Sequence, residues 1–172
     1  MDPLPSGVFL DFSIRKLEQL GSRIRECVAR LSDEQIWARH GEHENAVGNL
    51  VLHLAGNVGQ WIVAGIGGRP DTRARDEEFN ARGQVTGAEL MARLDGVVAE
   101  AVAVLKGVTP ERLAETYQPQ KYRVTVLEGI YHVVEHFSQH TGQIMFATKL
   151  LTGRELGFYK HLSRPVHGEQ TP

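Results

Sequence analysis

The sequence predicts an all-α protein, a four-helix bundle. Four segments repeat apolar residues at every third or fourth position, which is the spacing of one face of an α-helix. No stretch of any length alternates apolar and polar residues as a half-buried β-strand does. Four long helices with short caps favour a bundle. At 172 residues the chain is long enough to bury a core and is expected to form one domain over residues 1–172.

The first helix is predicted over about residues 8–30. Its apolar residues recur at spacings of three and four: Phe9, Phe12, Leu17, Leu20, Ile24, Cys27, Val28 and Leu31. Ser32 and Gln35 then have the spacing of a capping box, in which each residue caps the other's backbone. A short helical turn is therefore expected through Trp37.

The second helix is predicted to begin after Asn45, a residue type favoured at the N-cap, and to run to about Ala64. One arc of it collects the apolar residues Val47, Leu50, Val51, Leu54, Val58, Trp61 and Ile62. His53 lies just outside this arc on the helical wheel. Residues 65–85 are rich in glycine and charge, and we expect them to form a crossover or flap over one end of the fold.

A second capping-box pattern, Thr86 with Glu89, begins the third helix. Its apolar positions are Leu90, Met91, Leu94, Val97, Val98, Ala101, Val102 and Leu105. A short helical turn is expected at Thr109 and Pro110, because proline fits the first position of a helix.

Thr125 and Glu128 repeat the pattern and begin the fourth and longest helix, which runs to about Leu151. A short tail helix is expected around Phe158–Leu162, and residues 163–172 are expected to be disordered. The apolar arc of the fourth helix holds Val126, Leu127, Ile130, Val133, Val134, Phe137, Ile144 and Met145.

Composition narrows the functional classes. The net charge of −2 gives no electrostatic reason to expect nucleic acid or an anionic membrane as a partner. The single cysteine, Cys27, excludes an intrachain disulfide and fits a reducing cytoplasm, where we expect this protein. No run approaches the ~18 apolar residues of a membrane span, and the amino terminus lacks the basic start of a signal peptide.

Three histidines, His132, His136 and His140, follow one another at four-residue steps in the fourth helix. Each step turns the helix by only about 40° and rises roughly 6 Å, so neighbours can share one metal ion but the outer two cannot easily do so. On the wheel, His140 leans toward the apolar arc and His132 toward the polar side. The inward pair is therefore His136 and His140, and His53 occupies the matching boundary of the second helix.

Two interpretations of this pattern stay open. Three neutral imidazoles plus water form the ligand set of an open, potentially catalytic metal site. Histidines beside an apolar face are also often hydrogen-bonded core or surface residues. Polar residues near the same boundary either orient the imidazoles or lie exposed: Asn49, Asn57, Gln60 and Gln143. The remaining histidines are expected to be solvated: His40, His43, His161 and His167.

Two motifs resemble those of the DinB-like (DinB/YfiT) superfamily of metal-dependent enzymes. NLVLHLAGNVGQWI (Asn49–Ile62) is similar to the second-helix motif of that superfamily, and HVVEHFSQHTGQI (His132–Ile144) to its fourth-helix motif. The tail KLLTGRELGFYKHL (Lys149–Leu162) resembles an uncharacterised subgroup. The resemblance covers nearly the whole chain.

The resemblance implies an up-down-down-up bundle, commonly a homodimer, that holds a divalent metal, usually zinc or nickel, with three histidines. Carried over to this sequence, the ligands are His53, His136 and His140. One position departs from the pattern: many relatives have arginine after the last histidine, where this chain has Thr141. A substrate anion that binds such an arginine would lack that partner here.

Two functions are carried forward. The first is a metal-dependent enzyme, either a hydrolase or a low-molecular-weight thiol S-transferase that takes a small-molecule thiol or electrophile. The second is a non-catalytic, stress-related metal- or ligand-binding helical dimer. A third interpretation is a dimerisation domain whose histidines are vestigial. No catalytic side chain is assigned, since Glu135 projects about 100° away from His136. A fourth protein ligand closing the site would exclude the enzyme.

Overall fold

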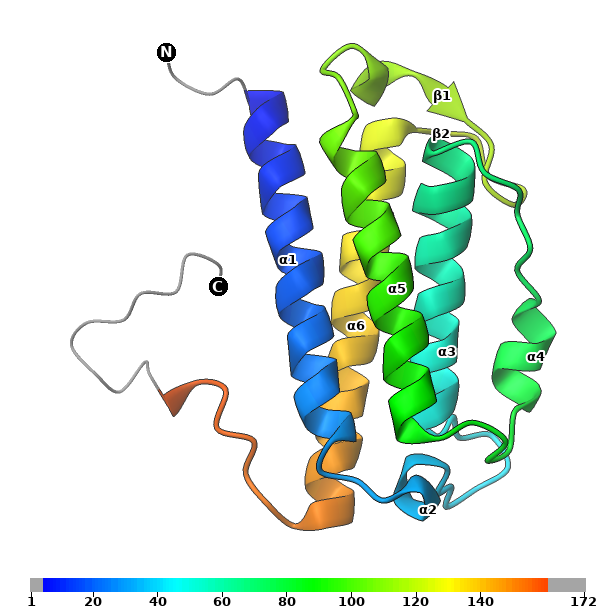
Figure 1. Ribbon diagram of the computed structural model, residues 1–172, viewed down its shortest axis with the longest axis vertical. Coiled ribbons are helices and arrows are strands. Elements are labelled where there is room, and N and C mark those ends of the chain that lie inside the picture. Colours follow the sequence, from blue (N-terminus) through cyan, green and yellow to red (C-terminus); the bar gives the residue numbers. More distant parts are fainter. Residues whose placement is uncertain (1–4, 161–172) are drawn as a thin grey trace.

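The computed structural model describes residues 5–160 (Figure 1). Ten elements follow in order: α1 (Pro5–Val28), α2 (Asp33–Ile36), α3 (Val47–Val58), the π-helix η1 (Gly59–Ile66), α4 (Arg75–Asn80), α5 (Gly87–Lys106), the 3-10 helix η2 (Arg112–Ala114), β1 (Thr116–Tyr117), β2 (Val124–Thr125) and α6 (Val126–Thr152). The all-α prediction is confirmed. The two strands are two residues long and pair antiparallel, with Thr116 opposite Thr125.

The four long helices form a bundle with the up-down-down-up arrangement. In Figure 1, α1 and α6 run down the view, whereas α3 and α5 run up it. Helix α6 packs against α1 and α3, and α5 packs against the same two helices. Because α3 and α5 are parallel neighbours, the chain between them must return along the whole length of the bundle. Residues 67–85 make this return, and we call them the strap.

The strap corrects one expectation. It lies along the side of α3 rather than over one end of the fold, and its helix α4 packs on α3 (Figure 1). The buried side chain of Asn49 holds it there, since its Nδ2 donates to the backbone oxygens of Glu78 (2.8 Å) and Ala81 (3.1 Å). At the far end Trp37 donates through Nε1 to the oxygen of Val85 (2.8 Å). These bonds satisfy backbone groups that a buried loop would otherwise leave without partners.

Helix ends follow the predicted capping chemistry, with one exception. The boxes of Ser32 with Gln35, Thr86 with Glu89, and Thr125 with Glu128 are all formed. The exception is α3, where Asn45 is not the N-cap. The cap is Ala46, whose backbone N–H donates to Asn49 Oδ1 (3.1 Å), so the side chain at the third helical position stabilises this terminus instead.

Helix α3 does not continue to Ala64 as a regular α-helix. From Gly59 it changes to the π-helix η1, which ends with a bond from Gly67 N–H to the oxygen of Ile62 (2.8 Å). A π-turn holds more residues than an α-turn, so side chains after Gly59 point in directions that the α-helical wheel does not give. Such segments occur often at functional sites, and this one carries Trp61.

The core is assembled from the predicted apolar faces. Its largest fully buried side chains come from all four long helices, from α2 and from η1: Leu17, Ile24, Ile36, Leu54, Ile62, Ile66, Leu90, Leu94, Leu105, Ile130, Phe137 and Ile144. Cys27 is fully buried among them, as expected. The prediction is wrong for Leu127, which is 42% exposed, and for Phe12, which is 37% exposed. Leu127, Val134 and Met145 lie at the edges of the predicted apolar arc of α6. Val134 and Met145 are half-buried, so the buried face of the helix is narrower than the arc that the helical wheel predicted.

Two further observations concern the rest of the chain. None of the helices in the described part is both long and apolar enough to cross a membrane. Phe158 and Tyr159 lie in a turn against Arg23 of α1. The remainder of the expected tail helix and the tail 163–172 lie outside the described residues, as do His161 and His167.

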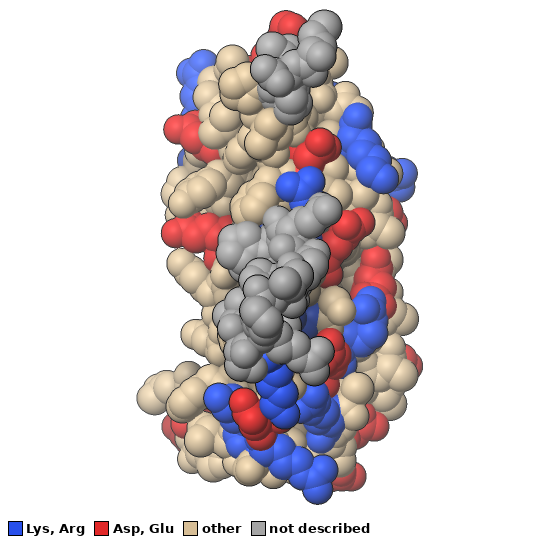
Figure 2. Space-filling model, turned by 90° about the vertical axis from the view of Figure 1, so that its left-hand side faces the viewer, with Lys and Arg blue, Asp and Glu red and all other residues tan. Residues whose placement is uncertain are grey.

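Acidic and basic side chains are interspersed over the side of the molecule that holds α1, where Figure 2 shows both colours along the visible surface. Among the contacts are Arg25 with Asp95, which joins α1 to α5, and Arg30 with Glu26 (3.8 Å). Exposed pairs of this kind add little to stability. The bundle therefore depends on its apolar core.

The bundle generates a prediction about two leucines. Leu54→Ala should lower the free energy of unfolding by about 2–5 kcal/mol, because Leu54 is fully buried and its loss leaves a cavity. Leu127→Ala is the matched control and should change it by less than about 1 kcal/mol. Urea denaturation followed by circular dichroism measures both. Equal losses would contradict this assignment of the core.

Candidate metal centre

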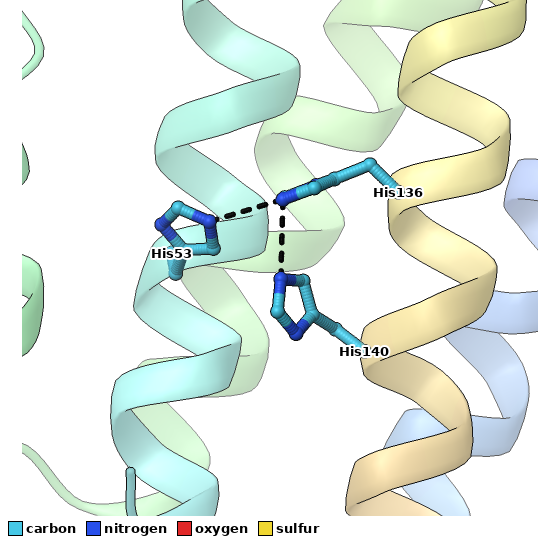
Figure 3. A group of neighbouring side chains, drawn as sticks. All are labelled: His53, His136 and His140. Carbon is cyan, nitrogen blue, oxygen red and sulfur yellow. Dashed lines mark hydrogen bonds between the residues drawn. The ribbon is translucent and has the colours of Figure 1, made fainter. Parts of the chain in front are cut away.

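Three histidines from two helices converge on one point between α3 and α6 (Figure 3). His53 lies on α3, and His136 and His140 lie one turn apart on α6. The Nε2 atom of His136 is 3.1 Å from His53 Nε2 and 3.1 Å from His140 Nε2. The three candidate ligand atoms all lie within 4.8 Å of one another. The structure thus brings together the three residues that the sequence singled out.

The spacing of these nitrogens fits a transition-metal ion. Zinc–imidazole bonds are about 2.0–2.1 Å long, so nitrogens 3.1 Å apart would subtend an angle of about 100° at the ion. This angle lies between the octahedral and tetrahedral values. Imidazole nitrogens suit zinc and nickel among others. Two of the three nitrogen pairs thus have the spacing of a metal site, and the three histidines could hold a divalent ion.

The strap supplies the outer partner of His53. Glu78 of α4 is only 8% exposed, and its Oε2 lies 2.9 Å from His53 Nδ1. With the proton on Nδ1, His53 donates to this carboxylate, which when ionised only accepts hydrogen bonds. The lone pair of His53 is then on Nε2, facing His136 and the centre of the cluster. Metal-binding histidines are oriented in this way by carboxylates in many proteins.

Arg73, also on the strap, keeps Glu78 ionised. Its guanidinium donates from Nε to Oε1 (2.7 Å) and from Nη2 to Oε2 (2.8 Å), a two-pronged pairing of both carboxylate oxygens. Burial raises the pKa of Glu78, but the hydrogen bonds from Arg73 and His53 outweigh it and leave that pKa below its usual range. Arg73 Nη2 also lies 3.0 Å from His53 Nδ1, which is a contact between two donors once Nδ1 carries its proton.

Gly56 makes room for this pair on the surface of α3. A Cβ atom at this position would lie 1.9 Å from Glu78 Oε1 and 2.9 Å from Arg73 Nε. A carbon atom and a carboxylate oxygen cannot lie this close together, so the side chain of Glu78 would have to shift. Any larger residue here would therefore push the carboxylate away from His53, which is three residues earlier on the same helix.

The other two histidines differ in their outer contacts. His140 Nδ1 lies 2.6 Å from Gln143 Oε1, so it donates to the amide oxygen and also keeps its lone pair on Nε2. His136 Nδ1 is buried and has no hydrogen-bond partner. Burial lowers the pKa of His136 to about 3, with further lowering by the neighbouring histidines and Arg73. Burial also lowers the pKa of His140. Both rings are thus neutral at pH 7, as metal binding requires.

A cavity of ≈ 460 Å³ opens beside the cluster, lined by His53, Asn57, Trp61, Arg73, Arg75, Gln120, Tyr122, Val124, Glu128, His132 and His136. Two of the three clustered histidines thus form part of its wall. Its volume lies in the range of small-molecule sites, about 300–1,000 Å³. A larger cavity, ≈ 910 Å³, lies between the strap, α3 and α5, and Arg73 and Glu78 line it as well.

His132 does not join the cluster, but it is not turned to solvent as its wheel position predicts. Its ring packs on Trp61 with centroids 4.2 Å apart and lines the cavity. Trp61 is buried, as expected, and it also stacks on His132 of α6. Burial lowers the pKa of His132, while Glu135 acts in the opposite direction. His132 thus forms part of the cavity wall.

The four polar residues left open by the sequence have different roles. Gln143 contacts His140, and Asn49 holds the strap. Gln60 bonds Arg73 through Oε1 (2.9 Å), one step further from His53, and Asn57 is buried beside the cavity. The loop histidines His40 and His43 are exposed, as the sequence predicts.

Thr141 is fully buried and donates to the oxygen of Phe137 (2.8 Å). This position therefore points into the core and away from the cavity. The cations beside the cavity are Arg73 and Arg75, both from the strap.

Sequence reasoning missed Arg73 and Glu78. They lie in a charged segment, and no periodicity distinguishes Glu78 from its exposed neighbour Glu77. The available signal was on α3, where Gly56 leaves a gap one turn after His53 and on the same side of the helix.

This outer contact can be tested through metal affinity. Glu78→Gln should weaken zinc and nickel binding by about 10- to 100-fold, because His53 loses the carboxylate that fixes its tautomer. Glu77→Gln is the matched control, since Glu77 is exposed on the same helix, and should leave affinity unchanged. Competition with a chromophoric chelator measures both. Equal affinity in the two variants would contradict the role of Glu78.

A second test uses acid unfolding of the metal-free protein. The pKa of His136 is lower in the folded protein than the unfolded value near 6.5, so the unfolded chain binds more protons between about pH 6.5 and pH 3. The free energy of unfolding should therefore fall as the pH is lowered through this window. His136→Gln should flatten that fall in urea titrations at several pH values. An unchanged profile would show that His136 is not held neutral.

Comparisons with known proteins agree with the fold. A crystal structure described as the conserved protein of locus from Enterococcus faecalis has a TM-score of 0.70 and 17% sequence identity, covering 84% of this chain and 97% of that chain. At this identity the likeness concerns the fold alone. No curated protein matches the chain. Residues 6–166 match a family, and because this match extends over most of the sequence, the chain belongs to the family described as "Protein of unknown function (DUF1572)".

Proposed function

We propose that this protein is a divalent-metal-dependent enzyme of the hydrolase or low-molecular-weight thiol S-transferase type, with His53, His136 and His140 as ligands of zinc or nickel. The observation that supports it is the convergence of three imidazoles at the wall of a cavity of ligand size. Within residues 5–160, no fourth histidine, cysteine, aspartate or glutamate belongs to this cluster. The open side of the ion would face a space that a small molecule can enter.

The chain's own groups would orient the reactants. A divalent ion held here would supply a Lewis acid that lowers the pKa of a bound water or thiol. Trp61, Tyr122 and His132 form an aromatic wall for the apolar part of a ligand. No Cys, Ser or Lys lines the cavity, and Cys27 lies in the core. The nucleophile would therefore be water or the thiol of a second substrate, and no side chain is assigned as a general base.

The alternative is a non-catalytic metal- or ligand-binding protein. A purely structural metal site is closed by four protein ligands, whereas a catalytic site keeps an open position. The three-histidine cluster beside its cavity favours the catalytic type. Without turnover, the same site would serve as a binding site for the metal or a small ligand.

Three further expectations belong to this proposal. Membership of the DinB-like superfamily is supported by the up-down-down-up bundle and by the positions of the three histidines on α3 and α6. A homodimer is supported by Phe146 and Leu150 of α6, which are each 65% exposed and one turn apart. A second copy of this chain that covers them is the partner we expect. A small-molecule thiol or electrophile is the expected substrate class.

The proposal is tested first by elemental analysis of untagged protein. Wild type should contain about one equivalent of zinc or nickel, His53→Ala should contain almost none, and His132→Ala should retain it. This difference follows because His132 lies outside the cluster, against Trp61. Equal losses in the two variants would refute the ligand assignment.

Turnover is measured next, on metal-loaded wild type and His53→Ala with panels of hydrolysable esters and amides and of thiol–electrophile pairs. Activity that depends on metal and on His53 would support the enzyme. A wild type that binds metal but turns over none of these substrates would favour the non-catalytic alternative.

A further inference from the structure

The strap carries four arginines, and three of them have polar partners. Arg69 and Arg73 form ion pairs with carboxylates, and Arg82 donates to backbone oxygens of the strap itself. The fourth, Arg75, forms no hydrogen bond or ion pair within residues 5–160. Its side chain nevertheless lines the cavity beside the three histidines. A cation in the wall of a ligand-sized cavity is thus left with its hydrogen-bonding capacity unused.

Arg75 is held next to the histidine cluster by an aromatic ring. Its Cζ atom lies 4.9 Å from the centre of the Phe79 ring, a cation–π contact. The Phe79 ring in turn lies 4.7 Å from the ring of His53, centre to centre. Phe79 therefore contacts both the guanidinium and one of the candidate metal ligands. A guanidinium that stacks in this way keeps its N–H donors at the edge of its plane, where a planar anion can bind them.

The other charged side chains of the cavity wall already have partners. Each nitrogen of Arg73 has an acceptor, and Glu78 accepts from two of them. Glu128 accepts through Oε2 from the backbone N–H (2.7 Å) and the hydroxyl (2.8 Å) of Thr125, and so caps the first turn of α6. Among the charged residues of this wall that the structure describes, Arg75 alone lacks a polar partner.

The rest of the wall is suited to a flat apolar group. Trp61 packs on His132 with ring centres 4.2 Å apart, and Tyr122 lies 6.1 Å from Trp61 on its other side. All three rings line the cavity, together with Val124. The volume of ≈ 460 Å³ admits a small organic molecule. The wall thus combines an aromatic surface with one unpaired cation.

We propose that this cavity binds a small organic carboxylate, with the carboxylate on the guanidinium of Arg75 and the apolar body against Trp61, Tyr122 and His132. Arginine binds carboxylates through two parallel hydrogen bonds, which a neutral amide cannot reproduce and an ammonium group cannot form. The inference rests on the proposed function, since it takes the cavity to be the substrate site, and it narrows the thiol or electrophile to one that carries a carboxylate. Arg75 is thereby a specificity-determining residue supplied by the strap.

The test compares three probes that share a phenylethyl body and differ in charge: 3-phenylpropionate, 3-phenylpropionamide and 2-phenylethylammonium. Isothermal titration calorimetry on the zinc-loaded full chain gives the three Kd values. Wild type should bind the carboxylate about 3- to 10-fold more tightly than the amide, because Arg75 offers a charge-assisted pair in a partly open site, and the ammonium should bind most weakly. The preference should shrink at high salt, which screens the pair.

Arg75→Gln should bring the ratio of the carboxylate and amide Kd values to about one while the Kd of the amide stays at its wild-type value. The unchanged amide also shows that the variant is folded with its cavity intact. Arg69→Gln is the matched control, since it removes the same charge from the strap at a residue that does not line this cavity. It should keep the wild-type ratio.

The place of binding is read from the two tryptophan indole N–H resonances. Trp61 lines the cavity, so its resonance should shift on addition of 3-phenylpropionate. Trp37 donates to the oxygen of Val85 and does not line the cavity, so its resonance should stay unchanged. A shift confined to Trp37 would place the probe elsewhere and overturn the inference.

Three other results would overturn the inference and leave the proposed function standing. Equal carboxylate-to-amide ratios in wild type and Arg75→Gln would do so, and they include the case in which the carboxylate binds zinc instead. Tightest binding of the ammonium probe would assign the selectivity to Glu128. Absence of binding by every probe would remove the carboxylate site. A wild type that holds no zinc or nickel would overturn the proposed function, and the same titrations on that metal-free protein would still decide the carboxylate site.

Discussion

The buried carboxylate of Glu78 joins the strap to the cluster, and the geometry of the site depends on it. Arg73 contacts both carboxylate oxygens of Glu78, and Gly56 leaves space for them on α3. The Oε2 atom of Glu78 also contacts His53 Nδ1. Removing one partner of a buried ion pair strongly destabilises a protein, because the other charge is left buried and unpaired. The strap is thereby tied to a defined position on α3, and the lone pair of His53 is tied to a defined direction.

This arrangement explains why the bundle uses a long crossover. Parallel neighbours such as α3 and α5 cannot be joined by a tight turn, and the chain must cover the length of the bundle between them. The protein uses that length to place a charged pair behind a metal-ligand candidate. The second half of the strap is also held by bonds from Asn49 to Glu78 and from Trp37 to Val85, so its position follows from the packing of α2 and α3.

The three histidines have unequal surroundings. His53 and His140 have fixed outer acceptors, whereas His136 stands between them with an unpaired nitrogen toward the interior. Its neutral, desolvated ring is suited to take up a metal ion and costly to protonate. The cavity wall thus includes a histidine that burial keeps neutral.

The sequence by itself determined the helices, their core faces and the pairing of His136 with His140, because these follow from local periodicity, capping chemistry and a fixed rise per residue. It also placed His53 at the matching boundary of its helix. Only the tertiary structure decided the position of the strap and, with it, the roles of Arg73 and Glu78, since nothing local distinguishes Glu78 from Glu77. The π-helix after Gly59, the stacking of Trp61 on His132 and the exposure of Leu127 were likewise decided by packing, which a helical wheel does not contain.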